Sequence, residues 1–445
     1  MKRFPVIFAL MLACACSAVA QDPVPRMEEY LAAVTKQGRF SGAVLVARDG
    51  KPILSKGYGL ADREWEVPNT PQTKFRLGSI TKQFTAALVL RLQEQGKLGV
   101  QDPLCKYFAD CPPAWSEITI HHLLTHTSGV PNFTSFPDYQ KTMMQPATMD
   151  SLIGRFKDRA LDFKPGEKFS YSNSGYVLLG YVIEKVGGKS YEDLVREQIF
   201  APLGMAGSGY DRSGQILPRR AAGYSRRGEA VTNAAYLDMS IPHAAGALYS
   251  TVEDLLLWDQ ALFTEKVLSA KSRELMFAPF KGNYAYGWAV QTQLNRKQIA
   301  HGGGINGFAT MIARYPEDRA TVIVLSNYDF ASAGRIARDL AAILFGEKYE
   351  VPRERVVAKV DPKIYDAYVG QYEVAPDFVL TVTREGDRLM AQRTGQDKIE
   401  WYPESETRFF LKVVDAQVTF VKDEQGRVTH LVLHEGGDRT AKKIK

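Results

Sequence analysis

The sequence predicts a mixed α/β fold in which an antiparallel sheet is flanked by helices, followed by a separate small antiparallel β domain. Strand-like segments stand near both ends of the first 346 residues, and helix-like segments fill the region between them. Beyond Gly346 the pattern changes to short alternating strands with tight turns. A chain of 445 residues is also long enough for two domains. We therefore expect one sheet built from distant segments, with a helical subdomain inserted between them.

The first strands and helices each have a local signal. A β-hairpin that turns at Asp49-Gly50 is predicted by SGAVLVARDGKPILSKGYG. Helical spacing extends to about Gly96 in SITKQFTAALVLRLQEQGKL, and a second helix, SNSGYVLLGYVIEKVGG, stops at Gly187-Gly188. A further helix begins at a predicted capping box, Ser250–Glu253.

Strands return towards the end of the first domain, which we assign to residues 21–346. The segments FATMIARY and ATVIVLSN are joined by a turn at 316–318 and precede a helix near 332–345. Residues 347–359 are charged and contain a proline, so we interpret them as a linker. Residues 360–445 form the C-terminal β domain, because alternating apolar segments there are separated by glycine-containing turns.

The first twenty residues, MKRFPVIFALMLACACSAVA, are typical of a secretory signal. Two basic residues precede an apolar run that is too short to span a membrane, and residues 18–20 form an A-x-A cleavage site. We expect cleavage before Gln21 and a periplasmic or secreted protein. Cys14 and Cys16 leave open the alternative of a lipoprotein with a lipid anchor.

Composition narrows the possible partners. The formal net charge is +6, and no long basic run indicates nucleic-acid binding. After the signal, Cys105 and Cys111 can form a short-loop disulfide or remain as two thiols. The cluster HHLLTH contains His121, His122 and His126 without a metal-binding motif, so a helix start and packing are the preferred roles. We expect no metal and no cofactor.

Two short motifs carry nucleophilic chemistry. Ser79 and Lys82 lie one helical turn apart, so an amine of lowered pKa can accept the serine proton. Tyr171 and Asn173, in YSN, follow a Pro-Gly turn and precede a helix. A tyrosine held between two cations can act as a phenolate, and Asn173 offers a donor and an acceptor to a substrate amide. The alternative for this motif is a packed tyrosine and a helix-capping asparagine.

Three interpretations fit HGGGINGF at residues 301–308. It satisfies the dinucleotide fingerprint G-x-G-x-x-G, and it resembles the H-G-G-G oxyanion loop of lipases. It also fits a glycine-lined substrate strand. The chain has no G-x-S-x-G nucleophile elbow, and the glycines lead into another strand where a nucleotide site needs a helix. The substrate strand is therefore favoured.

The motifs S-x-x-K, Y-x-N and H-G-G, in this order, resemble those of the serine β-lactamase and penicillin-binding-protein superfamily. More narrowly, the chain resembles the branch of class C β-lactamases, D-alanyl-D-alanine carboxypeptidases, D-aminopeptidases and related esterases. Supporting segments between residues 40 and 345 are FRLGSITKQFTA, ITIHHLLTHTSGVPNF, FSYSNSGYVLLGYVIEKVGG, APLGM and AAGALYSTVEDLLLW. The resemblance implies a β-lactamase/transpeptidase-like fold, and the C-terminal domain is similar to small β-barrel-like extensions of such hydrolases.

The resemblance also implies roles for individual residues. Ser79 would be the acylated nucleophile, Lys82 and Tyr171 would share general-base and general-acid work, and Asn173 would bind the substrate amide. His301 falls where class C β-lactamases carry a lysine, and it would hydrogen-bond the substrate carboxylate or Tyr171.

Glycines complete the implied site. The backbone N–H of Gly304 would form the oxyanion hole with that of Ser79, while Gly302 and Gly303 would allow close backbone approach. Because His301 is not a permanent cation, efficient β-lactamase activity is less expected. We expect an exported serine hydrolase of the D-alanyl peptidase or carboxypeptidase type, acting on a small peptide, ester or β-lactam. A short-chain esterase is the second candidate, a class C-like β-lactamase the third, and a non-catalytic binding protein the last. The oligomeric state and the role of the C-terminal domain stay open.

Overall fold

The computed structural model describes residues 22–353, 355–375, 378–412, 416–434 and 438–445. The predicted secretory signal and the cysteines considered for a lipid anchor lie outside these residues. Within the described part of the chain, no helix combines the length and the apolar character that a membrane span requires.

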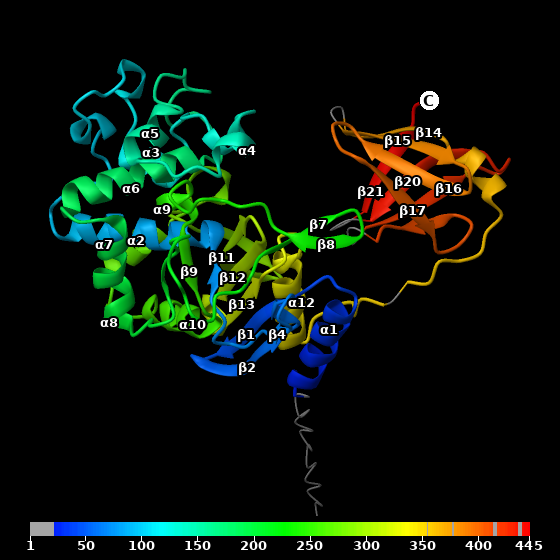
Figure 1. Ribbon diagram of the computed structural model, residues 1–445, viewed down its shortest axis with the longest axis horizontal. Helices are drawn as coiled ribbons and strands as arrows, with labels where there is room; N and C mark the ends of the chain where they lie inside the picture. Colours follow the sequence, from blue (N-terminus) through cyan, green and yellow to red (C-terminus); the bar gives the residue numbers. More distant parts are fainter. Residues whose placement is uncertain (1–21, 354, 376–377, 413–415, 435–437) are drawn as a thin grey trace, which may run out of the picture.

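A six-stranded, fully antiparallel sheet organises the first domain (Figure 1). In spatial order its strands are β10 (Ala289–Gln293), β11 (Arg296–Ile305), β12 (Phe308–Tyr315), β13 (Ala320–Ser326), β1 (Gly42–Arg48) and β2 (Lys51–Tyr58). Strands from the two ends of the domain pair directly, with Gly42 opposite Ser326. The predicted hairpin turn at Asp49-Gly50 has both residues at positive φ, as a two-residue hairpin turn requires.

Helices cover both faces of this sheet and make two separate apolar cores. On one face α1 (Val24–Lys36) and α12 (Ala333–Phe345) pack against Val44 and Val324. On the other face α2 (Thr81–Glu94) and α10 (Val252–Ala261) pack against Leu45. Because β1 and β13 are buried on both faces, they consist of almost continuous apolar residues.

The helical region lies between β2 and β10 in the chain. Its remaining helices are α3 (Ile120–Leu124), α4 (Tyr139–Thr142), α5 (Met149–Gly154), α6 (Asn173–Gly187), α7 (Tyr191–Val195), α8 (Ala201–Leu203), α9 (His243–Gly246) and α11 (Ala270–Met276). As predicted, α6 ends at a glycine in the left-handed conformation, Gly188. The capping box predicted at Ser250 is wrong by one residue. Thr251 is the N-cap, and its side chain accepts the N–H of Asp254.

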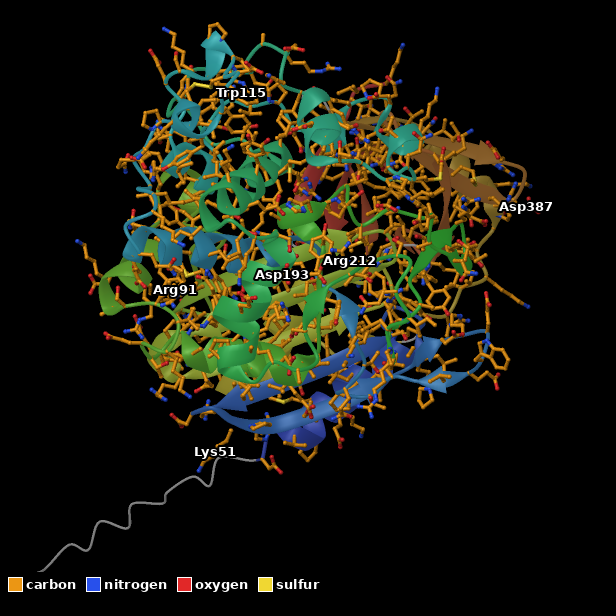
Figure 2. The ribbon with its side chains drawn as sticks, turned by 60° about the vertical axis from the view of Figure 1, so that its left-hand side comes forward. Lys51, Arg91, Trp115, Asp193, Arg212 and Asp387 are labelled. Carbon is orange, nitrogen blue, oxygen red and sulfur yellow. A yellow bond between two sulfur atoms is a disulfide. The ribbon has the colours of Figure 1, made fainter. Side chains whose placement is uncertain are left out.

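Cys105 and Cys111 form a disulfide. The loop that it closes packs Phe108 edge-on against the buried Trp115, with ring centroids 5.9 Å apart (Figure 2). Of the two alternatives that the sequence left open, the bridged one is therefore present. It fixes a short loop on the surface of the helical region.

The C-terminal domain is a closed barrel of eight antiparallel strands around an aromatic core, which includes Trp401 and Phe420. Its strands are β14 (Gly370–Ala375), β15 (Phe378–Glu385), β16 (Arg388–Arg393), β17 (Lys398–Pro403), β18 (Arg408–Phe410), β19 (Gln417–Lys422), β20 (Val428–His434) and β21 (Asp438–Lys443). A hairpin of the first domain, β7 (Tyr224–Arg227) and β8 (Ala230–Asn233), reaches the barrel (Figure 1). This arrangement confirms the predicted fold class.

Candidate active site

Ser79 occupies a single 3-10 turn, η1 (Gly78–Ile80), that leads directly into α2. Its side chain is half-buried, whereas Lys82, one turn further on, is fully buried. Gly78 has φ +54, a conformation that disfavours a side chain, so a glycine is needed immediately before the serine. The predicted helical spacing thus brings the hydroxyl and the amine together.

The Lys82 ammonium nitrogen has three polar neighbours. Nζ lies 3.1 Å from Ser79 Oγ, 2.8 Å from Asn173 Oδ1 and 2.9 Å from the carbonyl oxygen of Ala245 in α9. Burial lowers the pKa of Lys82 well below its ordinary value. The amine is therefore held by oxygen atoms in a site that favours its neutral form.

The bonding directions around Nζ define what this amine can do. The Asn173 amide oxygen and the Ala245 carbonyl oxygen can only accept hydrogen bonds, so each takes one N–H of Lys82. A neutral amine has two N–H groups and one lone pair. The lone pair is then left for the third neighbour, Ser79 Oγ, from which it can accept a proton.

Asn173 is the first residue of α6, and its side chain does not cap that helix. The amide oxygen faces Lys82, and the amide nitrogen donates to Thr134 Oγ1 at 3.1 Å. Its backbone N–H donates to Asn132 Oδ1 at 3.0 Å. The capping interpretation considered for this asparagine is therefore not what the structure has.

The ring of Tyr171 lies 4.9 Å from Lys82 Nζ, and its hydroxyl lies close enough to Ser79 for that residue to influence its pKa. Burial raises the pKa of Tyr171 above its ordinary value, and the interaction with Ser79 offsets only part of this. The phenol consequently stays protonated near neutral pH. A phenolate interpretation needs two cations beside this ring, and burial lowers the pKa of both Lys82 and His301, so the neutral form of each is favoured here.

His126 holds the loop that carries Tyr171. Its Nδ1 accepts the backbone N–H of Ser172 at 3.1 Å, and its ring lies 4.2 Å from the Tyr171 ring. Burial is the main reason why the pKa of His126 lies well below its usual value. A packing role was predicted for the HHLLTH cluster, and this buried neutral ring has one. In the described residues, no group of three or more side chains could hold a metal ion.

The glycines of HGGGINGF form the end of β11. Ile305 pairs with Phe308 across a two-residue turn, and in an antiparallel ladder hydrogen-bonded and non-bonded pairs alternate. The next pair, Gly304 and Ala309, is therefore a non-bonded one, so the N–H and C=O of Gly304 point away from β12. On that side β10 pairs with β11 only up to Ala300. An open strand edge thus remains beside Ser79.

Close packing requires a glycine at position 303 of this strand and at position 78, next to Ser79. A Cβ on Gly303 would lie 2.0 Å from the carbonyl oxygen of Leu77, whereas a Cβ on Gly304 would meet no atom within 4 Å. A Cβ on Gly78 would lie 3.0 Å from the nitrogen of Gly304. The strand therefore lies directly against the turn that carries Ser79. The backbone N–H of Ser79, from the turn, and that of Gly304, from the strand, can then face one developing oxyanion.

Both ring nitrogens of His301 are hydrogen-bonded to groups other than Tyr171. Its Nδ1 donates to the carbonyl of Gly302 at 2.6 Å, so Nε2 carries the lone pair and accepts the Tyr284 hydroxyl at 2.8 Å. Burial, aided by the charge of Lys82, lowers the pKa of His301 to about 4. This histidine is thus a neutral, fully hydrogen-bonded wall of the cleft.

Sequence reasoning missed several groups of this site. The Ala245 carbonyl could not be found from a side-chain motif, because any residue has a carbonyl. Thr134 and Tyr284 have no pattern that points to a site. His126 was noted in HHLLTH, and its contact with Ser172 depends on the fold alone.

Comparison with known proteins gives a consistent assignment. The Beta-lactamase family pattern matches residues 25–346, and the chain belongs to this family. Residues 354–443 match a domain of unknown function, DUF3471. The resemblance to the β-lactamase and penicillin-binding-protein superfamily is thereby confirmed.

Similar proteins cover most of the chain. Penicillin-binding protein 4* of Bacillus subtilis is 31% identical, over 96% of this chain and 100% of its own length. Teichoic acid D-alanine hydrolase of Staphylococcus aureus is 29% identical, over 69% of this chain and 75% of its own. The solved structure of a D-amino acid amidase from Ochrobactrum anthropi, in complex with L-phenylalanine, has a TM-score of 0.65 at 26% identity, over 73% of this chain and 99% of that one. The protein is a β-lactamase-fold hydrolase.

Proposed function

We propose that the protein is an exported serine hydrolase that forms an acyl-enzyme at Ser79 and cleaves D-alanyl or related D-aminoacyl bonds. The observation that carries this proposal is the arrangement around Lys82, whose lone pair is left for Ser79 Oγ. The signal-like N-terminus supports export. Two relatives whose names contain D-alanine or D-amino acid support the substrate class.

Acylation begins with attack of Ser79 Oγ on the substrate carbonyl carbon, while Lys82 takes the hydroxyl proton. Negative charge develops on the carbonyl oxygen and is stabilised by the N–H groups of Ser79 and Gly304. When the intermediate collapses, the bond to the leaving nitrogen or oxygen breaks. Tyr171 donates its proton to that leaving atom and regains one from the Lys82 ammonium. Asn173, close to the amine, also contacts the substrate amide.

Deacylation reverses the same proton movements. A water molecule attacks the ester carbonyl and gives its proton to Lys82. The carbon–Oγ bond then breaks, and Ser79 Oγ is reprotonated by the ammonium. A neutral Lys82 is needed at the start of each half-reaction, which agrees with the lowered pKa that burial produces.

The neutral state of His301 affects which substrates the cleft favours. A neutral imidazole with both nitrogens occupied gives a substrate carboxylate no cation to pair with. Amides and esters of D-alanine are therefore favoured over a C-terminal D-alanyl-D-alanine dipeptide. The same observation favours short-chain ester hydrolysis as the second candidate and disfavours efficient β-lactam hydrolysis.

Covalent labelling tests the mechanism directly. Wild-type protein should be labelled by a fluorescent penicillin or a fluorophosphonate, and Ser79→Ala should not. Ser116→Ala, an exposed serine in the same domain, is the matched control and should label like wild type. Equal labelling of Ser79→Ala and wild type would refute the acyl-enzyme. A hydrolysis panel of D-alanyl amides, p-nitrophenyl esters and nitrocefin then ranks the substrate classes.

A further inference from the structure

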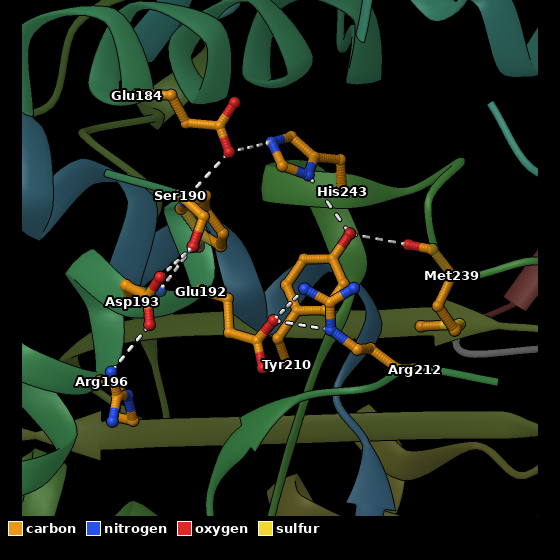
Figure 3. Close-up of polar contacts among 10 residues, drawn as sticks. Glu184, Ser190, Glu192, Asp193, Arg196, Tyr210, Arg212, Met239 and His243 are labelled. Atoms are coloured by element: carbon orange, nitrogen blue, oxygen red, sulfur yellow. Dashed lines mark hydrogen bonds and ion pairs between the residues drawn. The ribbon is translucent and has the colours of Figure 1, made fainter. Parts of the chain in front are cut away.

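A second cavity, of about 340 Å³, borders α9, the short helix whose Ala245 carbonyl holds Lys82. None of Ser79, Lys82, Tyr171 and Asn173 lines it. Among the residues that do are Glu184, Glu192, Tyr210, Arg212 and His243 (Figure 3), together with Asp238. The mechanism above uses none of these side chains.

Negative charge predominates in this cavity. Its four carboxylates are Glu184, Glu192, Asp211 and Asp238. Asp211 pairs with Arg76 and Arg220, and Glu192 pairs with Arg212. The other two carboxylates have no arginine or lysine ion pair among the residues that the structure describes. Asp238 nevertheless accepts hydrogen bonds from Ser240 and Tyr236 and lies within reach of the Arg76 charge, so Glu184 is the carboxylate that the cavity leaves for an occupant.

The hydrogen bonds around His243 define its tautomer. The Tyr210 hydroxyl lies 3.0 Å from the carbonyl oxygen of Met239 and 3.2 Å from His243 Nδ1. Because a carbonyl can only accept, the hydroxyl donates its single hydrogen to Met239. Nδ1 must then carry a hydrogen and donate it to the tyrosine oxygen. The other ring nitrogen, Nε2, is left with a lone pair.

That lone pair faces another acceptor. Nε2 lies 3.8 Å from Glu184 Oε1 and has no hydrogen-bond partner among the described residues, although His243 is only 9% exposed (Figure 3). Burial lowers the pKa of His243 to about 4, so the ring is neutral at neutral pH. Burial also raises the pKa of Glu184, and the N–H of Tyr191 offsets only part of this. While Glu184 is ionised, neither group offers a donor to the other, and an unsatisfied buried polar atom is destabilising.

His243 belongs to α9, the same short helix whose carbonyl oxygens contact Lys82 and Thr85. His243 begins this helix with φ +37, a conformation that is unfavourable for a side chain. Two residues later the Ala245 carbonyl accepts from Lys82, and the Ala244 carbonyl accepts from Thr85 Oγ1 at 2.6 Å. The Thr85 hydroxyl also contacts the Tyr191 hydroxyl at 2.8 Å. A shift of α9 would therefore move an oxygen that holds the amine.

We propose that this cavity binds a small organic cation with a primary ammonium group, which donates hydrogen bonds to Glu184 and to Nε2 of His243. A quaternary ammonium ion has the charge but no N–H donor, so it does not satisfy the two acceptors. Bound cation fixes the start of α9 and so changes the rate of acylation at Ser79. This last effect rests on the proposed function, whereas the binding does not.

Calorimetry on the full chain at neutral pH tests the site, with ethylammonium and tetramethylammonium as probes. Ethylammonium should bind wild type with a Kd of about 10 mM or tighter, and tetramethylammonium at least about tenfold more weakly. Glu184→Gln should weaken ethylammonium binding at least about tenfold, because the new amide can itself donate to Nε2. Asp193→Asn is the matched control. It removes one nearby charge outside the cavity lining and should bind ethylammonium within about threefold of wild type.

Three results would overturn the site: no ethylammonium binding to wild type, equal binding of tetramethylammonium, or unchanged affinity in Glu184→Gln. If that variant does not fold, ¹⁵N spectra of histidine-labelled wild type decide. The Nε2 signal of His243 must move with ethylammonium and stay with tetramethylammonium, and a signal that moves with neither refutes the proposal. Absence of Ser79 labelling in every variant would refute the proposed function and leave the binding result standing.

Discussion

Gly303→Ala tests whether the glycine strand sets the position of the nucleophile. The added Cβ would lie 2.0 Å from the Leu77 carbonyl oxygen and 2.3 Å from Thr310 Oγ1, which itself donates to that carbonyl. Ordinary contact begins near 3.4 Å, so strand and turn must separate by about 1.4 Å. Leu77 is only two residues from Ser79. Since a misplacement of about 1 Å can cost about 100-fold in rate, we expect acylation to fall at least about 100-fold.

The same change should destabilise the fold, because overpacking costs about 1–3 kcal/mol. Gly304→Ala is the matched control, since its Cβ meets no atom within 4 Å and its backbone φ is not positive. It should unfold at the wild-type temperature and lose activity only with bulky acyl groups. The assay is the second-order rate of fluorophosphonate labelling beside a thermal unfolding curve. Gly303→Ala with wild-type labelling and stability would refute the reasoning.

Further expectations concern the amine, its partner and the barrel. Acylation should rise with pH as Lys82 loses its proton, with a midpoint well below its ordinary pKa, and a midpoint near 10 would contradict this. Asn173→Asp should move that midpoint to higher pH, because a carboxylate beside the ammonium favours the charged form. Asn173→Ala, which leaves a buried N–H unsatisfied at a cost of about 1–3 kcal/mol, should slow labelling while the protein stays folded. Removal of the chain after residue 353 should alter relative rates between substrates more than fluorophosphonate labelling. The barrel contacts the first domain through exposed pairs such as Tyr402–Glu229, and complete loss of labelling in a folded truncation would contradict this.

Local chemistry made much of the fold predictable. The turn at Asp49-Gly50 and the helix end at Gly188 depend on positive φ, which few residue types adopt. Both can therefore be recognised in the sequence from the residue types at these positions. The start of α10 was misplaced by one residue, because Ser250 and Thr251 are both good caps and only packing chooses between them. The disulfide could not be decided either, since its geometry depends on how the loop folds.

The sequence by itself determined the class of chemistry, because Ser79 and Lys82 lie one helical turn apart and helical geometry alone brings them together. Only the tertiary structure decided how each partner works. The Ala245 carbonyl, 163 residues away from Lys82, directs the lone pair, and neither distance nor direction can be read from a motif. His301 was expected to meet substrate or Tyr171, yet folding gives both its nitrogens other partners and buries its ring. Hydrogen bonding and pKa depend on what surrounds a group in space, and that surrounding comes from segments far apart in the chain.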